Sequence, residues 1–108
     1  MKLLYEFDRT NALAVINGEI DHHNAAEARE MIDACICADM PRVLYLDLSD
    51  ITFCDSSGLG LVMGRKTKLE SYGGTLILKN PSEAVNKILN IAGMDKLLKI
   101  ERSKRNGT

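Results

Sequence analysis

The most pronounced hydrophobic pattern in the chain is the nearly continuous apolar run from Val43 to Leu48. Such a run predicts a central strand that is covered on both faces. Asp55, Ser56 and Ser57 come after it, and each can cap the start of a helix. Apolar residues then recur at helical spacing, at Leu59, Val62, Met63 and Leu69. We therefore predict a helix from about Ser56 to Tyr72, with two hydroxyl groups at its N-terminus.

Before this strand, hydrophobic alternation on either side of residues 8–11 predicts a hairpin of two strands, over 3–7 and 12–16. A polar loop over 18–23 is expected next. The following segment predicts a helix that begins at a capping box and ends before Pro41. Its apolar face comprises Ala28, Met31, Ile32 and Cys35, its capping box Asn24 and Glu27, and its solvated side Glu27, Arg29, Glu30 and Asp33.

In the second half of the chain, Gly73-Gly74 should stop the helix from Ser56, and a short strand is predicted over 75–78. A second capping box over 80–83, with Pro81 at the first helical position, begins a helix that Gly93 closes. Residues 97–100 can form a last short strand or turn. The order β-β-α-β-α-β-α with a short final element predicts an α/β fold. We expect one domain over 1–101, with helices packed on a mixed, mostly parallel sheet, and a mobile basic tail over 102–108.

Length, charge and cysteine content narrow the function classes. The 108 residues suffice for one domain, and 14 basic against 15 acidic side chains give a net charge of −1, which argues against a nucleic-acid partner. No apolar run approaches the ~20 residues that span a bilayer, and residues 1–7 lack the length of a signal-peptide core. Three cysteines, Cys35, Cys37 and Cys54, are expected to be unpaired thiols. A cytoplasmic protein without a membrane contact is therefore expected.

Several kinds of chemistry are disfavoured by spacing. Gly58, Gly60 and Gly64 do not match the dinucleotide pattern G-x-G-x-x-G, and no Gly-Lys-Ser/Thr follows for a P-loop. The serines lack the G-x-S-x-G elbow of a hydrolase, although His22 and His23 could approach them from another loop. Adjacent histidines, like Cys35-x-Cys37, point apart, so neither a metal nor another cofactor is expected. The simplest alternative remains that Asp55 or Ser56 is only an N-cap, and that the glycines only allow close packing.

Two motifs together carry a family resemblance. The segment Gly18-Glu19-Ile20-Asp21-His22-His23, followed by Phe53-Cys54-Asp55-Ser56-Ser57-Gly58-Leu59-Gly60, resembles the STAS domain family over nearly the whole chain. Within that family the sequence is similar to the single-domain anti-sigma factor antagonists, and the first motif narrows the likeness toward the sporulation members. Cys54 departs from the pattern, since a methionine usually stands there, and the tail after Ile100 is short and basic.

The resemblance implies a STAS-like fold and a binding protein that is a substrate rather than an enzyme. In such systems the unphosphorylated antagonist binds an anti-sigma factor, which is itself a serine kinase of the histidine-kinase-like ATPase fold, and a sigma factor is freed. The resemblance makes Ser56 the phosphorylated residue and a PP2C-type phosphatase the enzyme that reverses the modification.

The expected partner surface joins the two motifs, on the hypothesis that both loops lie at one end of the sheet. It comprises Asp21, His22, His23, Asp55, Ser56, Ser57, Gly58 and Leu59. Alternatively, Asp21 caps the helix near Asn24 and the histidines cover its first turn. A competing function is a small nucleotide- or anion-binding STAS regulatory module that uses the same helix N-terminus at Ser56.

Overall fold

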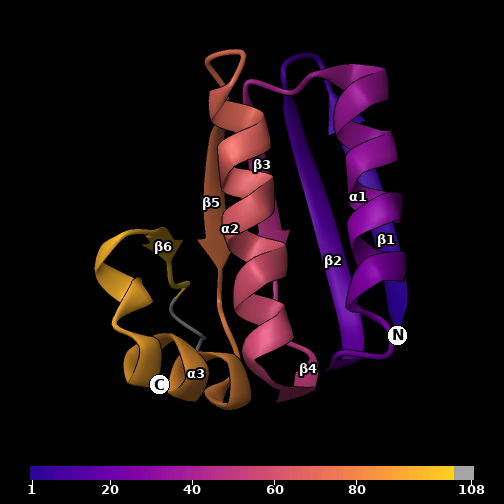
Figure 1. Ribbon diagram of the computed structural model, residues 1–108. Coiled ribbons are helices and arrows are strands. Elements are labelled where there is room, and N and C mark those ends of the chain that lie inside the picture. The colour runs from indigo at the N-terminus through magenta and orange to yellow at the C-terminus, as the bar shows by residue number, and fades with distance from the viewer. Residues whose placement is uncertain (104–108) are drawn as a thin grey trace.

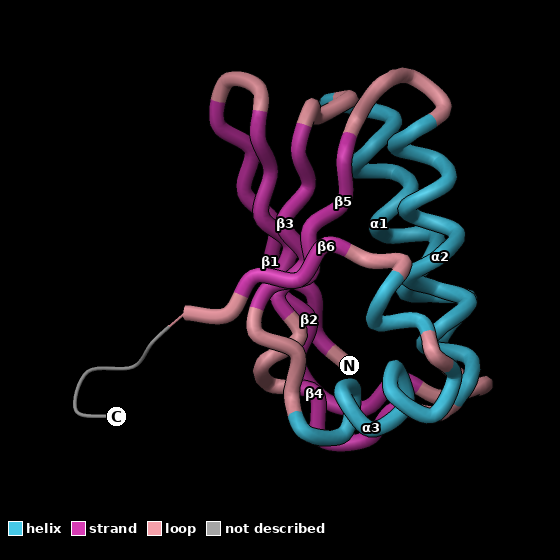
Figure 2. The backbone as a smooth tube through the Cα atoms, turned by 90° about the vertical axis from the view of Figure 1, so that its left-hand side faces the viewer, coloured by secondary structure: helices cyan, strands magenta, loops and turns pink. Residues whose placement is uncertain are grey.

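Two long helices cover one face of a six-stranded sheet (Figure 2), and alternate residues of its central strands are buried. The structure, a computed structural model, describes residues 1–103. Five strands form the path β1-β2-β3-β5-β6: Lys2–Asp8, Asn11–Ile20, Val43–Asp47, Thr75–Lys79 and Lys99–Glu101. The sixth strand, β4 (Ile51–Cys54), pairs with β2 off this path. Only the β1–β2 pairing is antiparallel among the strands of the described residues.

The helices α1 (Ala25–Asp39) and α2 (Ser56–Glu70) run side by side along the sheet (Figure 1). The helix α3 (Glu83–Ala92) lies at one end of the molecule, next to β4 (Figure 1), and the short 3-10 helix η1 (Met94–Lys96) connects it to β6. The core is apolar and lies between the sheet and the helices. It includes Ile16, Ile32, Ile36, Leu44, Leu46, Leu69, Leu78 and Leu89, each at most 1% exposed. Burial of this apolar surface, at ~25 cal/mol per Å², is the main stabilising contribution. The predicted α/β fold is confirmed.

The long strand β2 serves two partners. Its first half pairs with β3, from Asn11 opposite Val43 onward, and its last residues pair with β4, where Ile20 lies opposite Cys54. Between the two halves the register shifts at Gly18, whose φ of +105° suits a glycine. The predicted polar loop over 18–23 is therefore wrong for its first three residues, because β2 continues to Ile20.

The strand β4 is an element that the sequence did not predict. The apolar run gives β3, which ends at Asp47, and β4 follows as a separate strand before α2. In β4 only Ile51 and Cys54, at its two ends, are buried, while Thr52 and Phe53 are exposed. The short final element predicted over 97–100 corresponds to β6, and η1 before it was not predicted.

The helix starts differ in detail from the two predicted capping boxes. Asn24 precedes α1 without capping it; its side chain accepts the Asp21 N–H (3.0 Å) and donates to the Glu19 carbonyl (2.7 Å). The capping box at Asn24 is therefore wrong. At α3 the cap is Ser82, and Pro81 lies outside the helix rather than at its first position. Gly93 ends α3 with a φ of 68°, as predicted.

The two long helices are joined by an ion pair between residues 32 positions apart in sequence. Asp33 was expected to be solvated, yet its Oδ1 lies 2.8 Å from Nε of Arg65, although the contact lacks hydrogen-bond geometry. The Arg65 side chain is only 8% exposed. On α1 the buried residues are Ala28, Ile32 and Ile36, so the apolar face is centred away from Cys35.

The chain after β6 is held by side chains at the carboxyl end of β5 and on α3. Arg102 donates from Nη2 to Oδ1 of Asn86 (3.0 Å), and the Ser103 N–H donates to Oδ1 of Asn80 (2.7 Å). The rest of the predicted mobile tail, 104–108, lies outside the described residues. Cys35, Cys37 and Cys54 are free thiols, as predicted. Among residues 1–103, no helix combines the length and the apolarity needed to cross a membrane.

Candidate functional site

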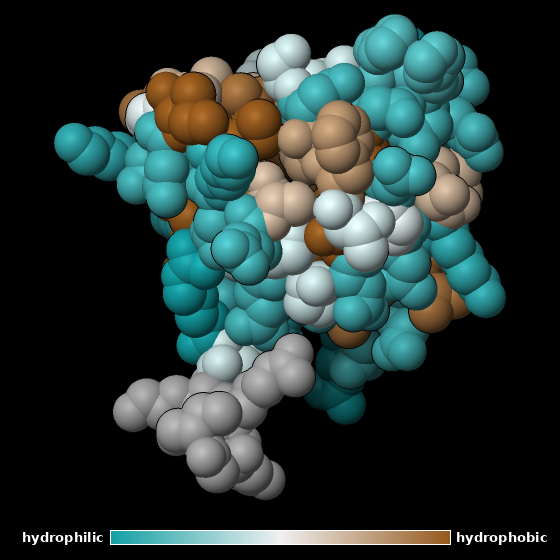
Figure 3. All heavy atoms as spheres, turned by 90° about the horizontal axis from the view of Figure 1, so that it is seen from below, coloured by the Kyte–Doolittle hydropathy of each residue, from teal (hydrophilic) through white to brown (hydrophobic). Residues whose placement is uncertain are grey.

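The pairing of β2 with β4 brings the two sequence motifs together. The strands run parallel, and the Asp55 N–H donates to the Ile20 carbonyl (3.2 Å) just beyond the last paired residues. The turn over 21–24 therefore lies beside the start of α2. Figure 3 shows this end of the molecule from below: most of it is hydrophilic, and hydrophobic atoms gather at one side of the view.

Asp55 is the N-cap of α2. Its Oδ1 accepts the Ser57 N–H at 2.8 Å, and its Oδ2 lies 3.7 Å from Nδ1 of His22. Desolvation tends to raise the pKa of Asp55, but hydrogen bonds from Ser57 and the neighbouring His22 outweigh it and lower the pKa below its usual value. The cap is therefore an ionised carboxylate at neutral pH.

The two serines occupy different environments. Ser56 is the first residue of α2 and is exposed, whereas Ser57 is half-buried. Because Asp55 supplies the cap, the Ser56 hydroxyl is not needed to cap the helix. It stands at the positive end of the helix dipole, where an anion is favoured.

The Asp21 carboxylate organises the turn before α1. Its Oδ1 accepts the backbone N–H groups of His23 (2.8 Å) and Asn24 (3.1 Å). The imidazoles of His22 and His23 lie with their centroids 4.0 Å apart, and their side chains are 73% and 79% exposed. The alternative of a structural role for Asp21 is thus correct as far as the turn is concerned, while both histidines project into solvent. Within residues 1–103, no group of three or more potential ligands could hold a metal ion.

Gly58 allows the start of α2 to pack closely on the end of β4. It is buried, and a Cβ at this position would collide with Sγ of Cys54. A glycine is needed there because α2 packs directly on the end of β4. Burial, with a smaller contribution from Asp55, raises the pKa of the Cys54 thiol to about 11, so the thiol is protonated and unreactive at neutral pH. Leu59 is half-buried against the core.

Two features near this site were not predicted from the sequence. Phe53 on β4 is 47% exposed, and an exposed aromatic beside a polar loop is a common interface residue. Arg29 is exposed, as predicted, and it also lines a groove between α1 and α2 together with Ser57. Phe53 could have been selected from its place in the motif. Arg29 could not, because its position depends on how two distant helices pack.

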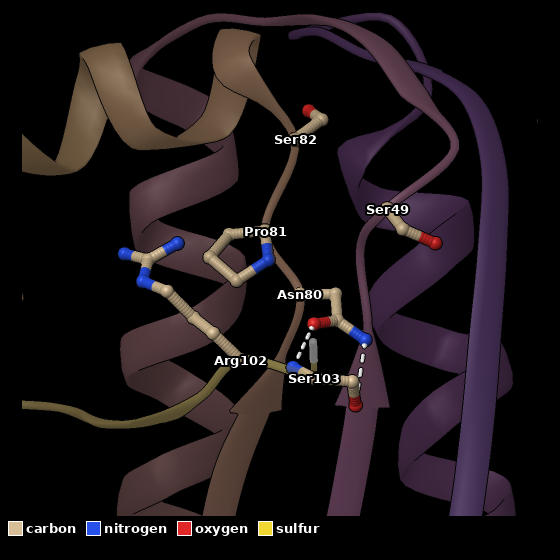
Figure 4. A pocket seen from close by; sticks show the side chains of 6 residues that line it. All are labelled: Ser49, Asn80, Pro81, Ser82, Arg102 and Ser103. Atoms are coloured by element: carbon tan, nitrogen blue, oxygen red, sulfur yellow. Dashed lines mark hydrogen bonds between the residues drawn. The ribbon is translucent and has the colours of Figure 1, made fainter. Parts of the chain in front are cut away.

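A second polar hollow lies away from these residues, at the carboxyl ends of β3 and β5 (Figure 4). Its volume is about 370 Å³, and it is lined by Ser49, Asn80, Pro81, Ser82, Arg102 and Ser103. Several of these polar groups pair with one another or with neighbours: Asn80 bonds to Ser103, and the Ser82 hydroxyl caps α3. None of the predicted site residues lines this hollow.

Comparisons with known proteins place the chain in a family. The sequence model of the STAS domain matches residues 5–106. An anti-sigma F factor antagonist of Lysinibacillus sphaericus is 39% identical over 77 residues, which cover 71% of this chain and 66% of the relative. An anti-sigma-B factor antagonist of Bacillus subtilis (strain 168) is 32% identical, covering 85% of this chain and 83% of the relative.

Solved structures agree with these relatives. The anti-sigma factor antagonist SpoIIAA in its unphosphorylated form has a TM-score of 0.80 at 30% identity, covering 96% of this chain and 90% of that protein. The Bacillus SpoIIAA in its phosphorylated form has a TM-score of 0.74 at 28% identity, covering 96% and 93%. The chain therefore belongs to the STAS domain family and, within it, to the anti-sigma factor antagonists.

Proposed function

We propose that this chain is a partner-switching antagonist controlled by phosphorylation of Ser56. Unphosphorylated, it binds an anti-sigma factor that is also a serine kinase of the histidine-kinase-like ATPase fold, and a sigma factor is released. Phosphorylation ends the binding, and a PP2C-type phosphatase restores it. The chain itself is a substrate and a binder, acting in the cytoplasm, where its three free thiols would stay reduced.

One observation carries this proposal: the hydroxyl of Ser56 is exposed at a helix N-terminus whose cap is supplied by Asp55. A kinase can reach this oxygen without unfolding α2. The existence of SpoIIAA in unphosphorylated and phosphorylated forms, with TM-scores of 0.80 and 0.74 to this chain, supports it further.

The charge of the phosphate explains how one oxygen could control binding. A phosphoserine carries about −1.5 to −2 charges at pH 7. The positive end of α2 would stabilise it by roughly 0.3–1 kcal/mol, and repulsion from Asp55 acts in the opposite direction. The fold should therefore change little. A partner surface that must lose water on contact would instead meet a strong new charge, so binding should fail.

The proposed partner surface comprises Asp21, His22, His23, Asp55, Ser56, Ser57 and Leu59, and Phe53 borders it. Gly58 is left out because it is buried. A partner that approaches this surface would touch the acidic pair Asp21 and Asp55 together with the two exposed imidazoles. Cationic groups on the anti-sigma factor would complement these carboxylates.

The test uses the purified anti-sigma factor of the same organism. After incubation with ATP, mass spectrometry should find phosphate on Ser56, and titration calorimetry should show at least about a hundredfold weaker binding of the modified form. Phosphate on Ser57, or equal affinity of the two forms, would contradict the proposal. Calorimetry of the free chain with ATP and GTP tests the competing nucleotide-binding module in the same experiment.

A further inference from the structure

A groove of about 290 Å³ runs between the N-terminal halves of α1 and α2. It is lined by Ala25, Ala26, Arg29, Ser57, Gly60 and Leu61. Ser57 belongs both to this groove and to the proposed partner surface, so the two are continuous. The lining is mostly small, and Arg29 is the one side chain in it that carries a full charge.

Gly60 leaves the groove open, although the fold of this chain does not require a glycine at this position. A Cβ at this position would meet no atom within 4 Å, and the backbone of Gly60 does not have a positive φ. A glycine inside a helix costs about 1 kcal/mol relative to alanine. Neither backbone conformation nor internal packing therefore requires glycine here. The missing side chain of Gly60 instead leaves space in the groove for a side chain of a partner.

The positive charge in the lining of the groove comes from Arg29. Arg29 is exposed, and Arg65 lies one turn along α2 from Leu61, with its side chain only 8% exposed and Nε 2.8 Å from Asp33. Burial lowers the pKa of Arg65, Asp33 raises it, and the nearby charge of Arg29 lowers it. Among the described residues, Nη1 of Arg65 has no hydrogen-bond partner. Asp33 therefore pairs with Arg65, and no ion pair involves Arg29 among the described residues.

The neighbouring surface has the opposite sign, since it carries Asp21 and Asp55. We propose that the groove is a second contact of the partner surface and that it receives an acidic side chain, aspartate or glutamate, of the anti-sigma factor. Arg29 binds the carboxylate at the mouth of the groove. The inference rests on the proposed function and specifies the partner's chemistry: cationic groups opposite Asp21 and Asp55, and an acidic group opposite Arg29. Such a pattern admits one orientation of the partner.

The experiment measures the affinity of the unphosphorylated chain for the purified anti-sigma factor by calorimetry. Arg29→Glu should weaken binding by roughly 30-fold or more, and Arg29→Lys should retain much of it, because a charge is kept and only the guanidinium fork is lost. The matched control is Arg42→Glu, an exposed arginine at the amino ends of β3 and β5, which should change the affinity by less than about twofold. Thermal melts of all variants check that the fold is intact.

A second pair of variants tests the space instead of the charge. Gly60→Leu fills the groove and should weaken binding by about tenfold or more, whereas Gly64→Leu, one turn along the helix and equally free of contacts, should not. An acidic residue of the anti-sigma factor whose replacement by lysine restores binding to Arg29→Glu would identify the occupant.

Affinity of Arg29→Glu within about twofold of the unsubstituted chain would overturn the inference while leaving the proposed function standing. Equal losses in Arg29→Glu and Arg42→Glu would also overturn it, since they would indicate a general charge effect. If the unsubstituted chain does not bind the anti-sigma factor at all, the proposed function fails first, and this inference with it.

Discussion

The starts of α2 and α3 are built from the same kinds of residue in different roles. At α3 the hydroxyl of Ser82 is itself the cap and accepts the Val85 N–H at 3.3 Å. At α2 the carboxylate of Asp55 is the cap, and the exposed Ser56 follows it as the first helical residue. A helix start therefore offers a hydroxyl for modification only where a neighbouring residue performs the capping.

The largest expected effect is on phosphorylation, which should require Ser56 and not Ser82. Ser56→Ala should abolish phosphorylation by the partner kinase and leave a permanent binder, because only a hydroxyl is removed. Ser82→Ala should be phosphorylated as fully as the unsubstituted chain. Mass spectrometry after incubation with the kinase and ATP measures both. Phosphate on Ser56→Ala, or its loss from Ser82→Ala, would remove the proposed difference between the two helix starts.

The next effect concerns the third residue of each helix, which is Gly58 in α2 and Val85 in α3. Gly58→Ala forces a Cβ onto Sγ of Cys54, and overpacking of this kind costs about 1–3 kcal/mol. We expect a melting temperature lower by at least about 4 °C. Gly64→Ala is the control: its Cβ meets nothing within 4 Å, so it should stabilise the helix by about 0.5–1 kcal/mol. A stabilised Gly58→Ala would show that α2 can move away from β4.

A smaller effect is expected from removal of the cap of α3. Ser82→Ala should cost about 1 kcal/mol of the free energy of unfolding, because the Val85 N–H loses its partner. Ser56→Ala should cost less, because the first residue of α2 is not the cap. Urea unfolding of the two variants makes the comparison. Equal losses would mean that the Ser56 hydroxyl also supports its helix.

The smallest effect distinguishes the two caps by pH. The folded-state pKa of Asp55 is lowered, so its stabilising contribution is present above the usual value of ~3.9 and is lost as the pH falls through the folded pKa. The cap of α3 does not titrate. Between pH 5 and pH 3, Asp55→Asn should therefore lose slightly less stability than the unsubstituted chain. Parallel thermal melts across this range measure the difference, and identical slopes would assign the acid sensitivity to other carboxylates.

Hydrophobic spacing predicted the elements that bury one clear face. The run over 43–48 and the stripe at Val85 and Leu89 gave strand and helix because apolar positions repeat with the period of each structure. The strand β4 was not predicted because its middle residues are exposed and only its ends are buried. Its partner, the end of β2, was hidden as well, since Gly18 and its neighbours resemble a turn and instead form a bulge in a continuing strand.

At the site, the sequence could predict features set by neighbouring residues, such as a helix cap. It could not predict contacts between residues far apart in the chain. A cap was predicted among Asp55, Ser56 and Ser57, and the structure shows that Asp55 supplies it. Asn24 misled because Asp21, three residues earlier, competes for its side chain. The pair Asp33 and Arg65, and the groove beside Arg29, depend on the packing of α1 against α2, which no short-range spacing encodes.

The short strand β4, which precedes Ser56, should open locally more readily than β3. Only the pairing from Gly18 to Ile20 joins β4 to the sheet, whereas β3 is bordered by strands on both sides. Local opening of β4 would break few hydrogen bonds and would leave β1, β2, β3, β5 and β6 assembled. Amide hydrogens of β4 should therefore exchange with solvent well before those of β3. Ser56, the serine proposed to be phosphorylated, thus follows a strand that is joined to the sheet on one side by a short pairing.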